Sequence, residues 1–229
     1  MYTLYITNKN YSSWSLRPWV LMQEKAIDFT EQLIPFPEHS SWETFRNFAP
    51  NGKVPCLHHD DLIVWDSLAI VEYLAEHYSG IWPVDRIARA WARSATAEMH
   101  SGFNTIRQEC GMNCGLRIQL HQISPALQKD LDRLNEIWAE GLTRFGGPFL
   151  TGAEFTAVDA FFCPIAFRAQ TYNLPLHSPY IQQLLSLKSM QAWYASALQE
   201  TWRDPAHERE NLAAGVILLD IRQSIRSEV

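Results

Sequence analysis

The sequence predicts a small mixed α/β domain followed by a larger helical domain. Short runs of alternating apolar residues in residues 1–80 enclose helical patterns, in the order strand, helix, strand, hairpin, helix. After a linker at residues 81–86 the apolar spacing is helical, and strand-like alternation does not return before the C-terminal tail. We therefore expect an α/β domain at 1–80 and an all-α domain at 87–229, a length that allows a sizeable core.

A polar turn joins the first strand to the first helix. The alternation of Leu4 and Ile6 predicts the strand, and a helical pattern starts near Ser15. Ser12 and Ser13 therefore lie at a helix N-terminus, where unpaired amides and the macrodipole favour an anion such as a thiolate and a hydroxyl can donate to it. Serine is also a preferred N-cap, so plain turn and capping roles suit both residues equally well. This stretch alone leaves the two interpretations open.

The second half of the α/β domain offers a further place for a ligand. Residues 27–35 predict a strand, and residues 53–57 and 62–65 predict a hairpin. Pro55 stands at the head of a strand, where a cis bond would leave the backbone of Val54 exposed to an extended, peptide-like ligand.

Asp66 and Ser67 stand directly ahead of a strongly helical stretch that begins at Leu68. One of the two is expected to be the N-cap. The other, with the free amides of the helix start, is suited to a carboxylate, and the acidic side chain is suited to an ammonium group. Capping alone would also account for both residues.

Helical patterns fill most of the second half of the chain. Asp85 is expected to cap a long helix that runs past Met99, with Met99, Phe103 and Arg107 along one face, and such a stripe usually belongs to the core. A second helix is expected from Ala126 to about Phe145.

The last predicted helices lead into an apolar tail. Thr156 and Asp159 form a capping signal ahead of a nearly all-apolar helix, which must be central. Two more helices are expected near residues 180–187 and 189–200, and the tail at residues 207–229 is apolar enough to require packing. A lid over a pocket and a dimer contact both remain open for this tail.

Composition excludes several classes of protein. A formal charge of −6 argues against binding to a phosphate backbone, which requires a basic patch. No stretch approaches the roughly 20 apolar residues of a membrane helix, and the chain enters a strand without a signal segment. We expect a cytoplasmic protein with no nucleic-acid or membrane partner. The 4 cysteines are too scattered for a disulfide framework. The spacing of Cys110 and Cys114 would suit a metal ion or a cross-link, but no second pair has the spacing of metal ligands. We therefore expect structural roles for the cysteines and no metal site.

Three motifs together resemble the glutathione site of the cytosolic glutathione transferases. They are Tyr-Ser-Ser-Trp-Ser-Leu-Arg at 11–17, Lys-Val-Pro-Cys-Leu at 53–57 and Asp-Ser-Leu-Ala-Ile-Val-Glu-Tyr-Leu at 66–74. Ser12, placed ahead of Arg17, is similar to the serine-type branch, and the serine pair most resembles the zeta class. The resemblance implies a thioredoxin-like N-terminal domain, an all-α C-terminal domain that forms the second-substrate pocket, and a homodimer.

Carried over position by position, the resemblance implies a role for each candidate residue. Ser12 donates to the glutathione sulfur and stabilises its thiolate, although the choice between Ser12 and Ser13 as the thiol contact stays open. The residues implied to bind glutathione are Ser13, His39, Lys53, the Val54 backbone, Asp66 and Ser67. Those implied to form the second-substrate pocket are Trp14, Met99, Phe103 and Arg107.

The implied activity is conjugation of glutathione to a small hydrophobic electrophile, as in detoxification, with glutathione as co-substrate. Zeta-type isomerases carry a cysteine where this chain has Trp14, and Thr171 stands about where their carboxylate-binding arginine is sought, although Arg168 lies on the same helix. Maleylacetoacetate isomerisation is therefore an alternative. A non-catalytic protein that binds glutathione or a partner is another, but this chain keeps both Ser12 and the Asp66–Ser67 pair. The sequence specifies neither the electrophile nor the pathway.

Overall fold

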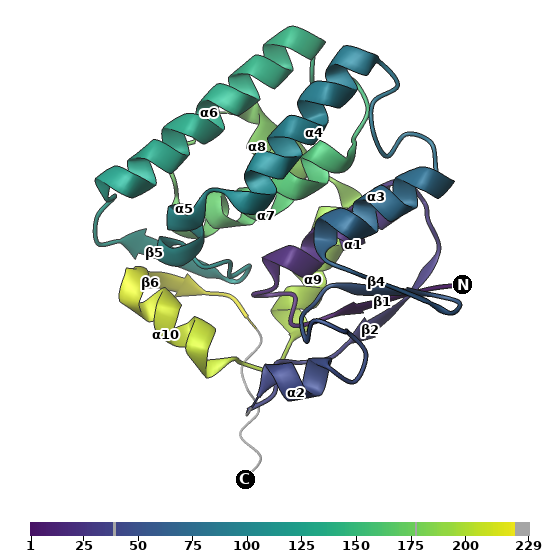
Figure 1. Cartoon of the computed structure of the whole chain (residues 1–229). Helices are drawn as coiled ribbons and strands as arrows, with labels where there is room; N and C mark the ends of the chain where they lie inside the picture. The colour runs from purple at the N-terminus through teal and green to yellow at the C-terminus, as the bar shows by residue number, and fades with distance from the viewer. Residues whose placement is uncertain (39, 177, 223–229) are drawn as a thin grey trace.

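The computed structural model describes residues 1–38, 40–176 and 178–222. A four-stranded sheet with α1 and α3 forms one side of the molecule, and the long helices α4, α6 and α7 lie above it in Figure 1. The elements of the sheet-containing part are β1 Tyr2–Ile6, α1 Ser13–Glu24, β2 Phe29–Leu33, α2 Ser41–Phe45, β3 Cys56–His59, β4 Leu62–Trp65 and α3 Ser67–His77.

The sheet has the order β2-β1-β3-β4, with β1 parallel to β2 and antiparallel to β3. Leu4 pairs with Glu31 on one side and with Leu57 on the other. Leu4 and Ile6 are fully buried, so the predicted alternation places them on the core face. Helix α1 makes the crossover between the two parallel strands. This arrangement confirms the thioredoxin-like domain that the resemblance implies.

The second part is mainly helical. Its elements are α4 Arg86–Ser101, α5 Asn104–Glu109, β5 Leu116–Leu120, α6 Pro125–Phe145, α7 Ala157–Tyr172, α8 Pro179–Leu185, α9 Lys188–Gln199, α10 Pro205–Ala214 and β6 Gly215–Asp220. Thr156 and Asp159 form the predicted capping box of α7, whose residues are almost all buried. Among the described residues, no helix is both long and apolar enough to cross a bilayer.

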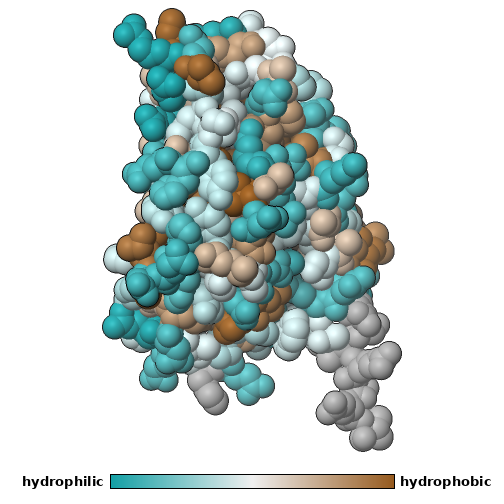
Figure 2. Space-filling model, turned by 90° about the vertical axis from the view of Figure 1, so that its right-hand side faces the viewer, coloured by the Kyte–Doolittle hydropathy of each residue, from teal (hydrophilic) through white to brown (hydrophobic). Residues whose placement is uncertain are grey.

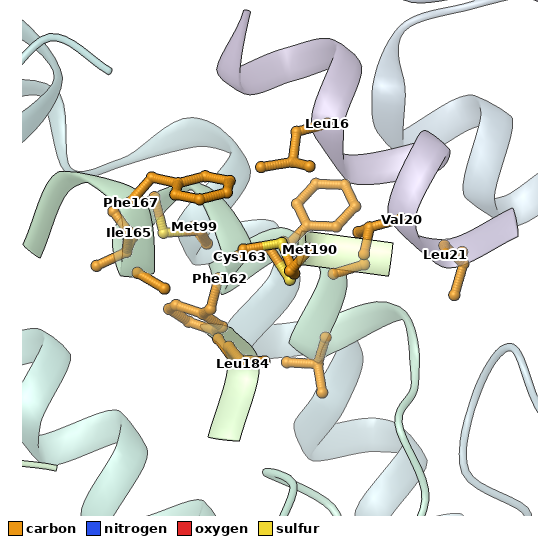
Figure 3. Close-up of a cluster of buried hydrophobic side chains, with 14 of the residues drawn as sticks. Leu16, Val20, Leu21, Met99, Phe162, Cys163, Ile165, Phe167, Leu184 and Met190 are labelled. Carbon is orange, nitrogen blue, oxygen red and sulfur yellow. The ribbon is translucent and has the colours of Figure 1, made fainter. Parts of the chain in front are cut away.

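Helices α1 and α7 join the two parts through one hydrophobic core. Figure 3 shows Leu16 and Val20 of α1 beside the apolar side chains of α7, among them Phe162 and Cys163. All four of these residues are fully buried. Because α1 begins at the serine pair, this contact also fixes where the serines lie relative to the helical part.

The predicted helix capped by Asp85 runs past Met99, but its predicted continuation to Phe103 and Arg107 was wrong, because the chain breaks the helix. Helix α4 ends at Gly102, whose amide donates to the Glu98 carbonyl at 2.8 Å, and Phe103 adopts the left-handed region with φ of 56°. A Cβ at position 102 would lie 2.8 Å from the same Glu98 oxygen, so the turn requires glycine. Arg107 therefore belongs to a separate helix, α5.

The all-α expectation for the second part also needs correction. Strand β5 pairs antiparallel with β6, with Leu120 opposite Gly215. Leu116 and Ile118 are buried and alternate with polar residues, a strand pattern whose pairing partner lies far along the chain. The tail therefore folds back as α10 and β6 onto the helical part of its own chain.

Candidate functional site

A cavity of about 340 Å³ lies where the two parts of the molecule meet. The start of α1 and the loop before β3 form one wall, and α5, α7 and α10 with the loop after α5 form the other. The first wall includes Tyr11, Ser12, Ser13, Trp14, Lys53 and Val54, and the second includes Arg107, Gly111, Met112, Arg168, His207 and Glu210.

A second, smaller hollow of about 230 Å³ adjoins the first wall. It shares Trp14, Lys53 and Val54 with the main cavity and adds Asp66 and Ser67 from the start of α3. The peptide bond between Val54 and Pro55 is cis, as the sequence suggested. The two hollows thus bring together most of the residues predicted to contact glutathione.

The two serines at the start of α1 have different hydrogen-bond partners. Ser12 is the N-cap: its Oγ accepts from the Ser15 amide at 3.3 Å and donates to Ser15 Oγ at 2.7 Å. Ser13 is the first residue of α1, and its Oγ accepts from Arg168 Nη2 at 3.3 Å. Both serines are buried and line the cavity. In these contacts the Ser13 hydroxyl keeps its own proton available for an acceptor in the cavity.

Asp66 and Ser67 differ in their contacts, although the sequence left open which of them caps the helix and which is available to a ligand. Asp66 is the N-cap of α3, with its carboxylate accepting from the Leu68 amide at 2.8 Å, and its other oxygen lies 3.5 Å from His100 Nε2. Ser67 is only 1% exposed, and its Oγ has no hydrogen-bond partner among the described residues. A buried hydroxyl without a partner is costly, so this atom is suited to a polar ligand group in the smaller hollow.

Three arginines lie near the start of α1: Arg17 and Arg168, which are buried, and Arg107, which is partly buried. The guanidinium of Arg17 lies 4.0 Å from the Trp14 ring on one side, and that of Arg107 lies 4.8 Å from it. Arg168 reaches the carbonyl oxygen of Cys110 as well as Ser13. Of the three, the sequence placed Arg107 in the second-substrate pocket, whereas the contacts of Arg17 with Trp14 and of Arg168 with Ser13 were not predicted.

Burial lowers the pKa of each of these arginines, and repulsion between neighbouring guanidinium groups lowers it further for Arg17 and Arg107. For Arg17, which is 0% exposed, burial shifts the pKa well below its usual value, and the charges of Arg107 and Arg168 lower it further. Burial and the charge of Arg168 lower the pKa of Arg107 to about 10, and burial lowers that of Arg168. Within the described residues, Nε, Nη1 and Nη2 of Arg17 have no hydrogen-bond partner. This group of cations with few counter-charges favours an anion in the cavity beside Ser12 and Ser13.

The candidates for the second-substrate pocket separate in the structure. Trp14 and Arg107 line the cavity. Met99 and Phe103 lie in the core at 1% and 7% exposure and do not line the cavity. His39 lies outside the described residues.

The tail contributes residues that sequence reasoning did not assign to the site. Tyr11 donates to Glu208 Oε1 at 2.7 Å, and Arg222 Nη2 donates to Glu208 Oε2 at 3.0 Å. The ring of His207 stacks on that of Tyr11 at a centroid distance of 5.0 Å. The tail is therefore a fixed wall of the cavity. The sequence carries no local signal for this contact, since its partners are separated by most of the chain.

The cysteines and other potential metal ligands do not form a second site. All four cysteines are free and buried, and burial raises the pKa of the Cys56 and Cys110 thiols to about 12. In the part of the chain that the structure describes, no three His, Cys, Asp or Glu side chains gather in a way that would hold a metal. The cavity beside the serines therefore remains the candidate site.

Comparison with known families gives a match at the N-terminal part. Residues 11–77 match the model of the glutathione S-transferase N-terminal domain, a range that contains all three motifs. Protein LigF of Sphingobium sp. strain NBRC 103272 / SYK-6 is 34% identical over 117 residues, which cover 48% of this chain and 45% of that protein. The chain thus aligns with less than half the length of that relative.

Other relatives align over most of the chain. A probable maleylacetoacetate isomerase of Caenorhabditis elegans is 25% identical over 186 residues, covering 77% of this chain and 82% of that protein. A solved glutathione transferase homologue from Burkholderia, with bound glutathione, superposes with a TM-score of 0.63 at 22% identity, covering 86% of this chain and 97% of that one. A glutathione S-transferase structure from Rhodospirillum rubrum F11 superposes with a TM-score of 0.64 at 20% identity, covering 90% of this chain and 97% of that one. These structures share the fold of this chain.

Proposed function

We propose that this chain, whose residues 11–77 match the glutathione S-transferase N-terminal domain, is a glutathione transferase that activates the glutathione thiol as a thiolate for attack on a small hydrophobic electrophile. The observation that carries the proposal is the cavity at the start of α1, where two serine hydroxyls, a helix N-terminus and buried guanidinium groups meet. Each of these groups favours an anion over its protonated form.

Glutathione fits the two adjoining hollows as an extended tripeptide. Its thiol would lie in the main cavity beside Ser12 and Ser13, and its cysteinyl backbone beside Val54. Its γ-glutamyl end would enter the smaller hollow, where the free Ser67 hydroxyl is suited to the carboxylate and Asp66 to the ammonium group. Lys53 lines both hollows and would attract the glycyl carboxylate; the same role is proposed for His39.

The site has enough interactions to activate a thiol. Lowering a thiol pKa from about 8.5–9 toward neutrality requires roughly 2–3 kcal/mol of preference for the anion. A hydroxyl hydrogen bond to a charged acceptor contributes about 1.5–3 kcal/mol, and a helix N-terminus adds up to about 1 kcal/mol. The guanidinium groups of Arg107 and Arg168 line the same cavity and add in the same direction.

The wall opposite the proposed thiol position would hold the electrophile. Met112 gives this wall apolar surface, and Arg107 and Arg168 give it positive charge. Trp14 adds apolar surface from the side of the serines. Met99 and Phe103, placed in the core, would act on the pocket only through the position of Arg107. A role in detoxification and a cytoplasmic location are part of the proposal.

A homodimer is also part of the proposal. Leu62, Ile63 and Trp65 of β4 are large apolar side chains that are 42–54% exposed. Ile63 and Trp65 line a hollow between β4 and α3, together with Leu68 and Glu72. The face drawn in Figure 2 carries separate apolar areas between hydrophilic ones, so apolar surface is not spread evenly over the molecule. An apolar strand at a sheet edge is suited to contact with a second copy.

One observation favours a second candidate function, maleylacetoacetate isomerisation. Arg168 lines the cavity, where its guanidinium would meet a substrate carboxylate, whereas Thr171 does not line it. Two relatives, from Caenorhabditis elegans and Drosophila melanogaster, are named as probable maleylacetoacetate isomerases. Trp14 occupies the position at which zeta-type isomerases carry a cysteine. A non-catalytic glutathione-binding protein is the third possibility.

Conjugation assays with the serine variants test the main proposal. Purified wild type is expected to conjugate glutathione to chlorodinitrobenzene. Ser12→Ala should lower kcat by about a hundredfold while the KM for glutathione changes little, because the hydroxyl acts on the anion. Ser94→Ala, an exposed serine on α4, is the matched control and should behave as the wild type.

The pattern of loss identifies the donor. A large loss in Ser13→Ala with full activity in Ser12→Ala would move the thiol contact to Ser13, whose proton is free in the structure. Glutathione binding without conjugation of any electrophile would favour the non-catalytic protein. Failure of the wild type to bind glutathione would refute the proposal.

A further inference from the structure

The imidazole of His207 lies on the cavity wall in an arrangement that suits proton transfer. His207 belongs to α10, and its Nδ1 lies 2.6 Å from Oδ2 of Asp204, the N-cap of that helix. A carboxylate at Nδ1 fixes the tautomer that carries a proton on this nitrogen. Nε2 has no hydrogen-bond partner within the described part of the chain, so it remains available to a ligand in the cavity that His207 lines.

Packing on both sides holds this ring in place. It stacks on Tyr11 at 5.0 Å with an interplanar angle of 22°, and it contacts Phe36 at 5.1 Å. Tyr11 is itself fixed by Glu208 and is the residue directly before Ser12. The ring is therefore held by three partners at a defined position across the cavity from the start of α1. A side chain held in this way loses little entropy when it meets a substrate.

We propose that His207 is the general acid of the reaction, and that its Nε2–H protonates the electrophile after the thiolate has attacked. This inference rests on the proposed function. It applies to electrophiles that develop negative charge on a carbonyl group, namely α,β-unsaturated ketones and aldehydes. Asp204 is a positioning residue that acts through the imidazole.

Each proton that moves in this reaction has a donor and an acceptor. The thiolate sulfur forms a bond to the β-carbon of the enone, and the electron pair of the C=C bond moves into the carbonyl group to give an enolate. The imidazolium Nε2–H then gives its proton to the enolate, and the neutral ring takes up from solvent the proton that the glutathione thiol released. The net reaction is addition of glutathione across the double bond, and no further reactant is needed. Displacement of chloride, in contrast, needs no proton donor.

The charges around the ring fit this role. Arg107 and Arg168 on the wall that carries His207, and Lys53 on the facing wall, make the cavity cationic and would attract the enolate. The charged and titratable groups around His207 are Arg203, Asp204, Glu208 and Glu210 on or next to α10, Tyr11 before α1, Lys53 before β3, Arg107 on α5, Arg168 on α7 and Arg222 after β6.

Parallel assays with two electrophiles test the proposal. His207→Phe keeps an aromatic ring against Tyr11 and Phe36 but has no proton to donate, and Asp204→Asn keeps the imidazole. For addition to benzylideneacetone, we expect His207→Phe to lower kcat by about a hundredfold. For displacement of chloride from chlorodinitrobenzene, the loss should be less than about threefold, because no acid is required. His121→Gln, an exposed histidine away from this cavity, should change neither rate.

The pH profile gives a readout that a structural role would not move. In the wild type, kcat for the enone should fall on the alkaline side of the pH profile, and this fall should be absent in His207→Phe. Asp204→Asn should lower kcat for the enone by a smaller factor and keep this fall.

Several results would overturn the assignment. Equal losses with both electrophiles, or unchanged enone turnover, would make His207 a packing residue of α10. A raised KM for glutathione with unchanged kcat would make it a binding residue for the tripeptide. Failure of the wild type to bind glutathione would instead refute the proposed function. The assay with chlorodinitrobenzene detects that failure separately from any defect in enone addition.

Discussion

The two walls of the cavity are built in different ways. One wall consists of the starts of α1 and α3, where serine and aspartate cap helices within a few residues of the proposed ligand contacts. The other wall is assembled from α5, α7 and α10, which are separated by long stretches of sequence. The first wall is a set of local motifs, whereas the second exists only after the whole chain has folded.

The two walls would also have different roles in the proposed reaction. The motif-built wall would bind glutathione and hold its thiol, while the assembled wall would hold the electrophile and supply Arg107, Arg168 and His207. One side chain bridges the two walls, because Arg168 of α7 donates to Ser13 of α1. The proposed activation of the thiol would therefore depend on both walls, although the motifs occur in only one of them.

Arg168→Met is expected to have the largest effect on this link. Loss of the guanidinium removes the donor to Ser13 and a positive charge from the cavity, so kcat for conjugation should fall by about 30-fold, roughly 2 kcal/mol of transition-state stabilisation. Steady-state kinetics would measure it, with Arg86→Met at the exposed start of α4 as the control. Arg168→Lys, which keeps the charge, should recover part of the loss; kcat unchanged in Arg168→Met would show that the two walls act independently.

Glu208→Gln is expected to have a smaller effect, on stability. Burial alone would raise the pKa of Glu208, but hydrogen bonds from Arg222 and Tyr11 outweigh it and lower the pKa below the usual carboxyl value. The carboxylate therefore stabilises the folded chain above that value, and the contribution is lost as the pH falls through the lower, folded value. At pH 7 the variant should lose about 1 kcal/mol of unfolding free energy, and the deficit should shrink toward pH 3.

Urea unfolding at the two pH values would measure this difference. Glu76→Gln, an exposed carboxylate on α3, is the control and should match the wild type at neutral pH. A deficit that is the same at both pH values would show that the carboxylate charge does not hold α10 against Tyr11.

Much of the fold was predictable where the signals are local. The alternation at Leu4 and Ile6, the helix starts at the two serines and at the Asp66–Ser67 pair, and the capping box at Thr156 all act over a few residues, and the structure confirms each of them. The structure then identifies Ser12 and Asp66 as the N-caps. The break at Gly102 was missed because the apolar spacing continues across it, while only the backbone conformation of Phe103 reveals the turn.

The assembled wall had no comparable signal. Strand β5 shows the right alternation, but its partner β6 lies about a hundred residues away, and a strand of this length is ambiguous without its partner. His207 and Arg168 are ordinary residues of a tail and an apolar helix until packing brings them to Tyr11 and Ser13. The glutathione contacts could therefore be proposed from sequence motifs, whereas the residues opposite them could not.

The most direct test of thiolate activation at the start of α1 is a thiol titration in the presence of bound glutathione. Thiolate absorbance in the ultraviolet would be followed against pH for the wild type, Ser12→Ala and Ser13→Ala. We predict that the pKa of bound glutathione lies well below the free-thiol value of about 8.5–9 and returns toward it in Ser12→Ala. A bound thiol with the same pKa as free glutathione in the wild type would contradict this account.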